Sequence, residues 1–349
     1  MKKTLLTTLF LMLIALVSFQ CGKDDDNKTE AATTATIEGV VSYDGSAKAD
    51  GAIVSLSTEP NAAKVVSRVV ADENGKYSII GVAEGTYYVS AKFNTGNTNN
   101  EKSLDNFVFE TAAEVEVKVE AGATVVAKDL ALVANAATGT GKIDLTDGWE
   151  YDATHSTISF EFLYDASNAL FKGHFADVAF ADKYEATEEN LFKFDQANIA
   201  ATAFTARVNL PSIETGSPGG RDGLSGCVRK TFGVVLDEAD TTATGDYNAT
   251  AISDPTGFAY LICKSTTAYG DGYKSICDFK FNGKTTQVEL YFRFIEGYEG
   301  EDRSGNAMKY SSLQGWFEFN PLADYGISSG HLKETDVKVM ASVQFIKAL

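Results

Sequence analysis

The chain has 349 residues, 22 of them Phe and only 5 Pro, and its formal net charge is -18. This excess of carboxylates argues against nucleic acid as a partner, because nucleic-acid binding depends on clustered Lys and Arg, and against charge-driven adhesion to anionic lipid. Short runs of Val, Ile, Thr, Tyr and Phe between Gly, Asn and Asp predict an all-β protein, and the length allows two modest domains.

The first twenty residues have the pattern of a secretory signal peptide. Two lysines precede a mostly apolar run over residues 5–19, which is short for a membrane span. Cys21 follows almost at once, and three aspartates occupy residues 24–26. The arrangement resembles a bacterial lipoprotein leader, with Gln20 where such leaders usually carry a small residue. The resemblance implies that Cys21 is acylated and anchors the protein to the outer membrane, with exposure at the cell surface favoured over the periplasmic face. The alternative is ordinary signal-peptide cleavage, which would release a free secreted protein.

Residues 21–35 are polar and small and predict a flexible tether, after which residues 36–134 show a compact β pattern. Asn74-Gly75 lies between two strand-like runs and is a strong hairpin signal. The order of DENGKYSIIGV and EGTYYVSAKF resembles the carboxypeptidase regulatory-like domain, a small transthyretin-like β-sandwich. The resemblance implies a non-catalytic spacer or binding module, with the spacer favoured. Residues 135–147 read as a small-residue linker.

Residues 148–349 hold 17 of the 22 Phe, so the larger apolar core is expected there. Ile158, Phe160 and Phe162 alternate along one strand and therefore share a face. About two hundred residues suffice for one eight-stranded antiparallel β-barrel. A closed sheet with rings on its inner face must fill its interior with side chains or with a ligand, and the alternation alone favours side chains.

Five segments of this half, in order, resemble the YceI-like family of lipocalin-like barrels that hold a polyisoprenoid in an apolar tunnel. They are WEYDATHSTISFEF, LFKGHFADV, NLPSIETGSPGGRDGLSG, CDFKFNGKTTQVEL, and WFEFNPLADYGISSG with DVKVMASVQF. The resemblance implies a non-catalytic binding protein without a cofactor. The chain departs from the family at Gly223, Tyr164 and Leu322, where the family usually has polar or basic residues. If those family residues contact the polar end of the ligand, this chain would hold that end differently or would hold another lipid.

The expected tunnel wall consists of aromatic side chains: Phe160, Phe162, Phe175, Phe279, Phe281, Phe292 and Phe317. Arg221 and Asp222 lie in a Gly-rich stretch, where they can form a local ion pair or a group at the tunnel mouth. Acidic insertions at residues 236–255 and 295–309 are expected to be long loops at a barrel rim.

Three histidines, His155, His174 and His331, form no metal-binding motif, and a metal site is not expected. GEDRSGN, at residues 300–306, has oxygen ligands but lacks the EF-hand spacing, so a solvated loop is favoured over a calcium site. No nucleophile is paired with a base in a known motif. An enzyme acting on lipid is therefore the least favoured function.

Export would place the cysteines in an oxidising compartment. A turn centred near Gly270 places Cys263 opposite Cys277 across a hairpin, which predicts a disulfide and leaves Cys227 as the odd thiol.

Two functions compete for the chain as a whole. One is an exported lipoprotein that holds a long apolar ligand, an isoprenoid or similar lipid. The other is a cell-surface adhesion or scaffold protein whose barrel is filled by its own side chains. A continuous apolar cavity would favour the first, and a filled interior the second.

Overall fold

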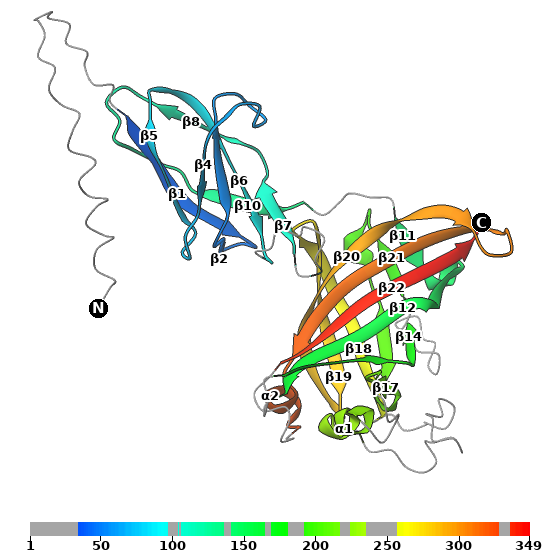
Figure 1. The fold of residues 1–349 in the computed structure, drawn as a ribbon. Coiled ribbons are helices and arrows are strands. Elements are labelled where there is room, and N and C mark those ends of the chain that lie inside the picture. Colours follow the sequence, from blue (N-terminus) through cyan, green and yellow to red (C-terminus); the bar gives the residue numbers. More distant parts are fainter. Residues whose placement is uncertain are drawn as a thin grey trace, which may run out of the picture.

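The computed structural model describes residues 34–96, 104, 106–135, 141–164, 169–180, 192–216, 224–234, 257–327 and 336–349. These residues are almost entirely β and form a sandwich followed by a barrel, as the sequence predicts (Figure 1). None of the helices within these ranges is long and apolar enough to cross a membrane. Cys21, Arg221, Asp222 and His331 lie outside the described residues, as does the whole acidic insertion at 236–255.

The sandwich is built around strand β1, whose two halves join different partners. The first half pairs antiparallel with β5 and parallel with β9, and the second half pairs with β2 and β10. Strands β3, β4, β6, β7 and β8 complete the fold through antiparallel ladders. The strands are β1 (Ala35–Tyr43), β2 (Ala47–Lys48), β3 (Ile53–Ser57), β4 (Val65–Val70), β5 (Lys76–Val82), β6 (Gly85–Asn94), β7 (Val108–Thr111), β8 (Val115–Val119), β9 (Val125–Ala127) and β10 (Leu130–Ala134).

The Asn74-Gly75 turn forms where the sequence places it, between β4 and β5. Gly75 has a φ of 72°, a left-handed conformation that glycine adopts without strain. The Asp72 carboxylate accepts hydrogen bonds from the backbone N–H groups of Asn74 and Lys76. The turn does not close a simple hairpin, however, because the ladder partner of β5 is β1.

The second body contains the remaining strands and two short α-helices. They are β11 (Lys142–Asp144), β12 (Trp149–Tyr164), β13 (Ala169–Phe175), β14 (Val178–Phe180), β15 (Lys193–Asp195), β16 (Thr205–Asn209), β17 (Ile213–Glu214), β18 (Phe258–Tyr269), β19 (Gly272–Phe281), β20 (Lys284–Glu301), β21 (Ala307–Phe319) and β22 (Val337–Ala348), with α1 (Leu224–Thr231) and α2 (Pro321–Tyr325).

The barrel is closed and has eight strand positions around its circumference. At two of these positions, two consecutive short strands take the place of one continuous strand. β13 pairs with β17 and β14 pairs with β16, while Ala176 and Asp177 bridge these ladders through hydrogen bonds to Ser212 and Asn209. β13 and β14 therefore form one interrupted strand of the barrel, and β16 and β17 form the neighbouring one. From there the ladder runs through β18, β19, β20, β21 and β22 and returns to β12, with every pairing antiparallel. This is an eight-stranded up-and-down barrel.

The β20–β21 hairpin differs from the loop expected over residues 295–309. Both strands continue past the barrel wall, and their ladder reaches Glu301 and Ala307. The rings of Tyr298 and Tyr310 stack across it with centroids 4.8 Å apart. Cross-strand aromatic pairs of this kind stabilise a two-stranded ladder, so the acidic insertion is a long hairpin with a short turn.

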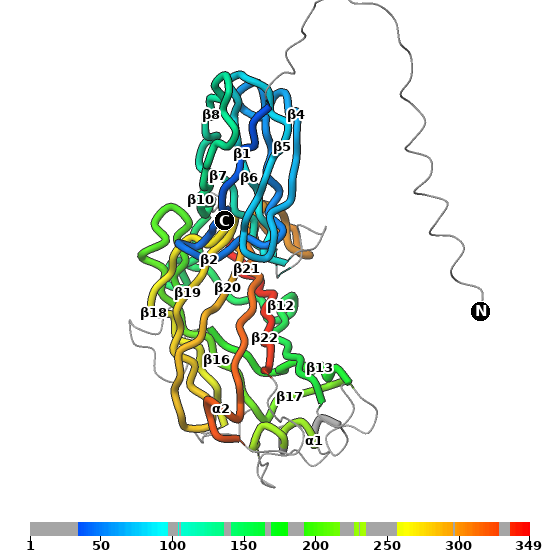
Figure 2. Tube along the Cα trace, turned by 90° about the vertical axis from the view of Figure 1, so that its left-hand side faces the viewer, coloured from blue at the N-terminus to red at the C-terminus, as the bar shows by residue number. Residues whose placement is uncertain are grey.

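The two ends of the barrel are closed by different elements (Figure 1). At the end facing the sandwich, β11 pairs with β15 and buries Ile143 and Phe194 fully. This strand and the following 3-10 turn occupy part of the predicted linker, so the barrel's chain begins before residue 148. α1 and α2 lie at the opposite end, as both views show (Figure 2).

The sandwich and the barrel share a core at the β18–β19 turn. Tyr269, at the end of β18, is buried in the hydrophobic cluster of the sandwich. Its ring centroid lies 4.9 Å from that of Phe109, 5.3 Å from that of Phe107 and 4.9 Å from that of Tyr291 on β20. The barrel therefore contributes a side chain to the interior of the other domain.

Polar contacts surround this aromatic junction. The Asp271 carboxylate accepts hydrogen bonds from the backbone N–H of Val108, at 3.0 Å, and from the Arg293 guanidinium, at 3.1 Å. Lys274 donates to Asp44 at 2.9 Å. These bonds join β7 and the β1–β2 turn to β19 and β20, so the junction has directional contacts as well as apolar packing.

Candidate functional site

The barrel encloses a cavity whose wall is almost wholly apolar. Its volume is about 100 Å³. A buried water needs a cavity of roughly 10–15 Å³, so the barrel's own side chains do not fill the interior. The lining residues are Ile158, Phe160, Phe175, Phe180, Phe192, Phe204, Ala206, Val208, Leu210, Phe232, Ala259, Leu261, Phe279, Phe281, Leu290, Phe292, Leu313, Gly315, Trp316, Phe317, Phe319, Val337, Val339, Ala341 and Val343.

Six of the seven phenylalanines expected in the tunnel lie on this wall, and the seventh lies beside it. Phe162 is buried but does not line the cavity; its ring packs between those of Phe171 and Phe232, with centroids 5.8 and 5.7 Å away. All seven were expected on the inner face because every second residue of a strand points to the same side of the sheet. The alternation therefore predicts which face a residue occupies. It does not predict where along the barrel the cavity ends, because that depends on the elements that close the barrel.

Four further aromatic residues line the cavity but do not belong to a long alternating strand, so the sequence pattern does not predict that they face inward. Phe180 ends the short strand β14, Phe192 and Phe204 lie just outside β15 and β16, and Phe232 follows α1. Three of these four rings, with Phe345, form a chain of contacts near the β11–β15 end, and Phe232 packs against Phe160 at the α1 end. They set the length of the cavity rather than its circumference.

A glycine on β13 makes room for the central ring of the wall. A Cβ at Gly173 would lie 2.5 Å from Cζ of Phe160 and 2.9 Å from the carbonyl oxygen of Glu214. Such contacts are too short for carbon atoms, and backbone atoms cannot move away easily. Gly173 thus lets the Phe160 ring lie across its ladder partner, and this position is expected to accept no larger residue.

Helix α1 is held to the barrel by a buried cation. Arg229 is almost fully buried, and its Nη1 donates hydrogen bonds to the carbonyl oxygens of Ile213, at 2.8 Å, and Pro211, at 3.3 Å. Charge-assisted bonds of this kind are stronger than neutral ones. They fix α1 against β17 and so position Phe232 at the end of the cavity.

Helix α2 is anchored in a similar way by Tyr325. Its hydroxyl donates to the carbonyl oxygen of Phe279 at 3.0 Å and also contacts the hydroxyl of Thr286. Burial raises the pKa of Tyr325 to about 12, so the hydroxyl stays protonated and able to donate at neutral pH. The rings of Phe279 and Phe281 pack against it, which closes the wall below α2.

The predicted disulfide is absent, although the two cysteines lie opposite each other as the sequence predicts. Cys263 and Cys277 are ladder partners on β18 and β19, but both carry free thiols, as does Cys227. A bulge follows Cys263, and its sulfur lies 3.3 Å from the hydroxyl of Thr266 and 3.7 Å from that of Ser275. The sulfur of Cys277 instead faces the carbonyl oxygen of Ser275. The two thiols are thus engaged with polar neighbours rather than with each other.

The thiols should differ sharply in reactivity. Burial raises the pKa of the Cys277 thiol well above its ordinary value, whereas Cys227 is exposed on α1. Because the thiolate is the reactive form, iodoacetamide at pH 8 is expected to modify Cys227 in minutes and to leave Cys263 and Cys277 unmodified until the protein is unfolded. Mass mapping of the labelled peptides measures this. Rapid modification of Cys277 in the folded protein would contradict the buried position.

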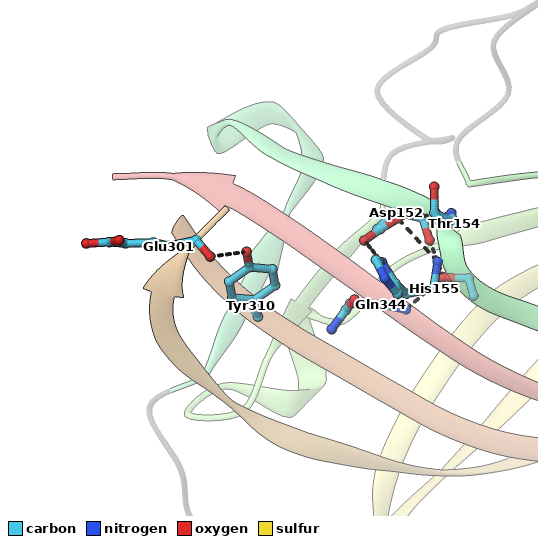
Figure 3. A network of polar contacts seen from close by, with 7 residues as sticks. Asp152, Thr154, His155, Glu301, Tyr310 and Gln344 are labelled. Atoms are coloured by element: carbon cyan, nitrogen blue, oxygen red, sulfur yellow. Dashed lines mark hydrogen bonds and ion pairs between the residues drawn. The ribbon is translucent and has the colours of Figure 1, made fainter. Parts of the chain in front are cut away.

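The histidines within the described ranges have structural partners on the outer face. His155 lies on a bulge of β12, where its Nδ1 is 2.7 Å from a carboxylate oxygen of Asp152 (Figure 3). The same carboxylate accepts the backbone N–H of Thr154, which shapes the bulge. His174 on β13 lies 3.6 Å from Glu214. Neither histidine faces the cavity, and no cluster of metal-binding side chains occurs in the part of the chain that the structure describes.

The chain is similar to several solved structures. No protein-family model and no curated protein matches the sequence. Among solved structures, the chain is similar to Burkholderia cenocepacia BcnA, with 13% identity over 56% of this chain and 99% of that one and a TM-score of 0.35. It is also similar to the Campylobacter jejuni YCEI protein, with 11% identity over 50% of this chain and 84% of that one and a TM-score of 0.30. At scores this low the likeness carries no conclusion about function.

Proposed function

We propose that this protein binds a long apolar molecule, with an isoprenoid chain favoured, inside the barrel and without chemical conversion. The observation that supports the proposal most strongly is the unfilled cavity with its apolar wall. Apolar pockets with few polar groups are the usual setting for hydrophobic ligands. A scaffold protein would gain stability by filling this space, because unfilled apolar volume is destabilising.

Binding would be driven by burial of the ligand's hydrocarbon. Each buried methylene contributes about 0.8 kcal/mol, so one five-carbon isoprene unit contributes roughly 4 kcal/mol. A few units would offset the cost of ordering the chain without strong polar contacts. The lining residues include no carboxylate, amine, imidazole or thiol within the described part of the chain, which is why we propose binding rather than catalysis.

The preference for an isoprenoid comes from the ordered sequence resemblance to the YceI-like family. The test is uptake of a supplied polyprenol by purified, delipidated protein, followed by gel filtration and lipid analysis. One polyprenol per barrel supports the proposal. Uptake of no polyprenol and no fatty acid, with the protein folded, would leave the adhesion or scaffold function as the better one.

We further propose that the chain is an exported lipoprotein, anchored to the outer membrane through acylated Cys21. The leader and the polar tether after it support this proposal. One acyl chain gives only marginal membrane binding, and several are needed for a firm anchor. Replacing Cys21 with Ala is therefore expected to move the protein from the membrane fraction to the soluble fraction of cells. Equal partitioning of wild type and C21A would argue for a free secreted product.

A further inference from the structure

The cavity ends abruptly on the side of the barrel that faces the sandwich. Strand β22 shows the place, because its inward-facing residues Ala341 and Val343 line the cavity, whereas the next one, Phe345, is fully buried and does not. Phe192 lines the cavity and packs against Phe345, with ring centroids 4.7 Å apart. The Phe192 ring therefore separates the cavity from the packed end of the barrel.

A second ring completes this end of the cavity. Phe204 also lines the cavity, and its ring centroid lies 5.3 Å from that of Phe192 and 6.3 Å from that of Phe292 on the wall. Phe192 is 1% exposed and Phe204 is 6% exposed. These two side chains, Phe192 and Phe204, form a continuous apolar surface that we call the aromatic floor.

Backbone hydrogen bonds hold the aromatic floor in place. The carbonyl oxygen of Phe192 accepts a hydrogen bond from the backbone N–H of Leu145 at 3.1 Å. The next residue, Lys193, exchanges two backbone hydrogen bonds, at 2.7 and 2.9 Å, with Ala203, which precedes Phe204. A ligand that pushed the floor aside would have to break these buried main-chain bonds, which is costly.

The opposite end of the barrel is closed by elements that side chains hold. Arg229 fixes α1 through two hydrogen bonds to backbone carbonyl oxygens, and the hydroxyl of Tyr325 fixes α2 through one. Displacing a short helix held in this way breaks fewer bonds than displacing a paired strand, and elements of low local stability open first. The geometry therefore favours entry of a ligand at the helix end, with its leading end directed toward the floor.

We infer that Phe192 and Phe204 form the blind end of the ligand site and set the number of isoprene units that the barrel holds. The inference deepens the proposed lipid-binding function and rests on it. Each unit that enters buries further apolar surface, so affinity should rise with chain length until the leading unit meets the floor. Units beyond that number stay outside the cavity and add little. The aromatic floor thus determines the preferred chain length.

Removal of one floor ring should lengthen the site by about one unit. A phenyl ring and an isoprene unit contain nearly the same number of carbon atoms, and the cavity has a volume of about 100 Å³, so the loss of one ring is a large change. Apolar cavities created by such truncations stay dry and bind small hydrocarbons such as benzene. F192A and F204A are therefore each expected to accept a longer chain than the wild type.

The experiment uses the full chain with C21A, so that no acyl anchor contributes, and a series of all-trans prenols that differ by one isoprene unit. Their affinities are measured by displacement of the uncharged fluorescent probe N-phenyl-1-naphthylamine. In C21A alone, affinity should rise with each unit and then level off. In F192A the levelling-off should move to the next longer prenol, which should bind at least tenfold more tightly than it binds C21A alone.

Two further variants separate a change of cavity length from a loss of stability. F192L keeps most of the side chain's apolar volume and should give a smaller shift in the same direction, which keeps the test decisive if F192A does not fold. F93A is the matched control, because Phe93 is 7% exposed in the core of the sandwich and does not line the cavity. Its levelling-off should equal that of C21A alone.

An unchanged levelling-off in folded F192L and F204A would overturn the inference. So would a shift in F232A without one in F192A, because the helix end would then be the blind end. If C21A alone binds no prenol of any length, the proposed function fails. The floor would then still predict that benzene raises the unfolding temperature of F192A and not that of C21A alone; no such rise would refute the floor as well.

Discussion

Aspartate in place of Phe160 is expected to abolish retention of an apolar ligand and to destabilise the barrel strongly. Phe160 is 1% exposed, and its ring contacts those of Phe162, Phe175 and Phe232. Removal of a buried Phe side chain alone costs about 3–5 kcal/mol. The carboxylate adds a desolvation penalty, because the cavity wall offers it no partner among the described residues.

The neighbouring position supplies a matched control for this substitution. Ser159 is on the same strand but faces outward, so S159D adds the same charge on the other side of the wall. Urea unfolding and polyprenol retention should be nearly unchanged in S159D and strongly reduced in F160D. Phe160→Leu, which keeps an apolar side chain, should retain ligand with a smaller loss of stability. Equal behaviour of F160D and S159D would mean that Phe160 does not face a binding cavity.

Replacing Tyr269 with alanine is expected to uncouple the sandwich from the barrel. The side chain fills part of the sandwich core and packs on Phe107, Phe109 and Tyr291, so its loss should cost about 3–5 kcal/mol. Calorimetry of the wild type should show one unfolding transition, because the domains share this core. Y269A should show two transitions, with the first at lower temperature.

An exposed tyrosine of the same barrel serves as the comparison. Tyr298 is 63% exposed on the β20–β21 hairpin, and Y298A should change the transition temperature by only a small amount. Two separate transitions in the wild type, or a single unchanged transition in Y269A, would show that the junction contributes little. Polyprenol binding by Y269A at low temperature should persist, since Tyr269 does not line the cavity.

The strands and their inward faces could be predicted because a period of two is visible in one sequence. Phe279 and Phe281, for example, alternate with Asp278 and Lys280, and both phenylalanines line the cavity. The pairing of Cys263 with Cys277 followed from counting residues around a turn. The bulge that follows Cys263 cannot be recognised from the amino-acid composition of the strand, and the disulfide prediction fails at this bulge.

The ends of the barrel could not be predicted in the same way. Phe192 and Phe232 lie outside long alternating runs, and only the fold brings them to the cavity. Ile143 sits in a stretch whose small residues suggested a linker, yet it is fully buried through the pairing of β11 with β15. Contacts between segments far apart in sequence decide these positions, and local patterns do not report them. The predicted mouth residues Arg221 and Asp222 stay predictions.

Native mass spectrometry of the protein purified without detergent from its own host tests the central claim most directly. The account predicts a folded chain that carries one co-purifying molecule of isoprenoid or similar lipid mass, released on unfolding and absent from F160D. A folded wild-type chain with no bound lipid, which also takes up no supplied polyprenol, would contradict it.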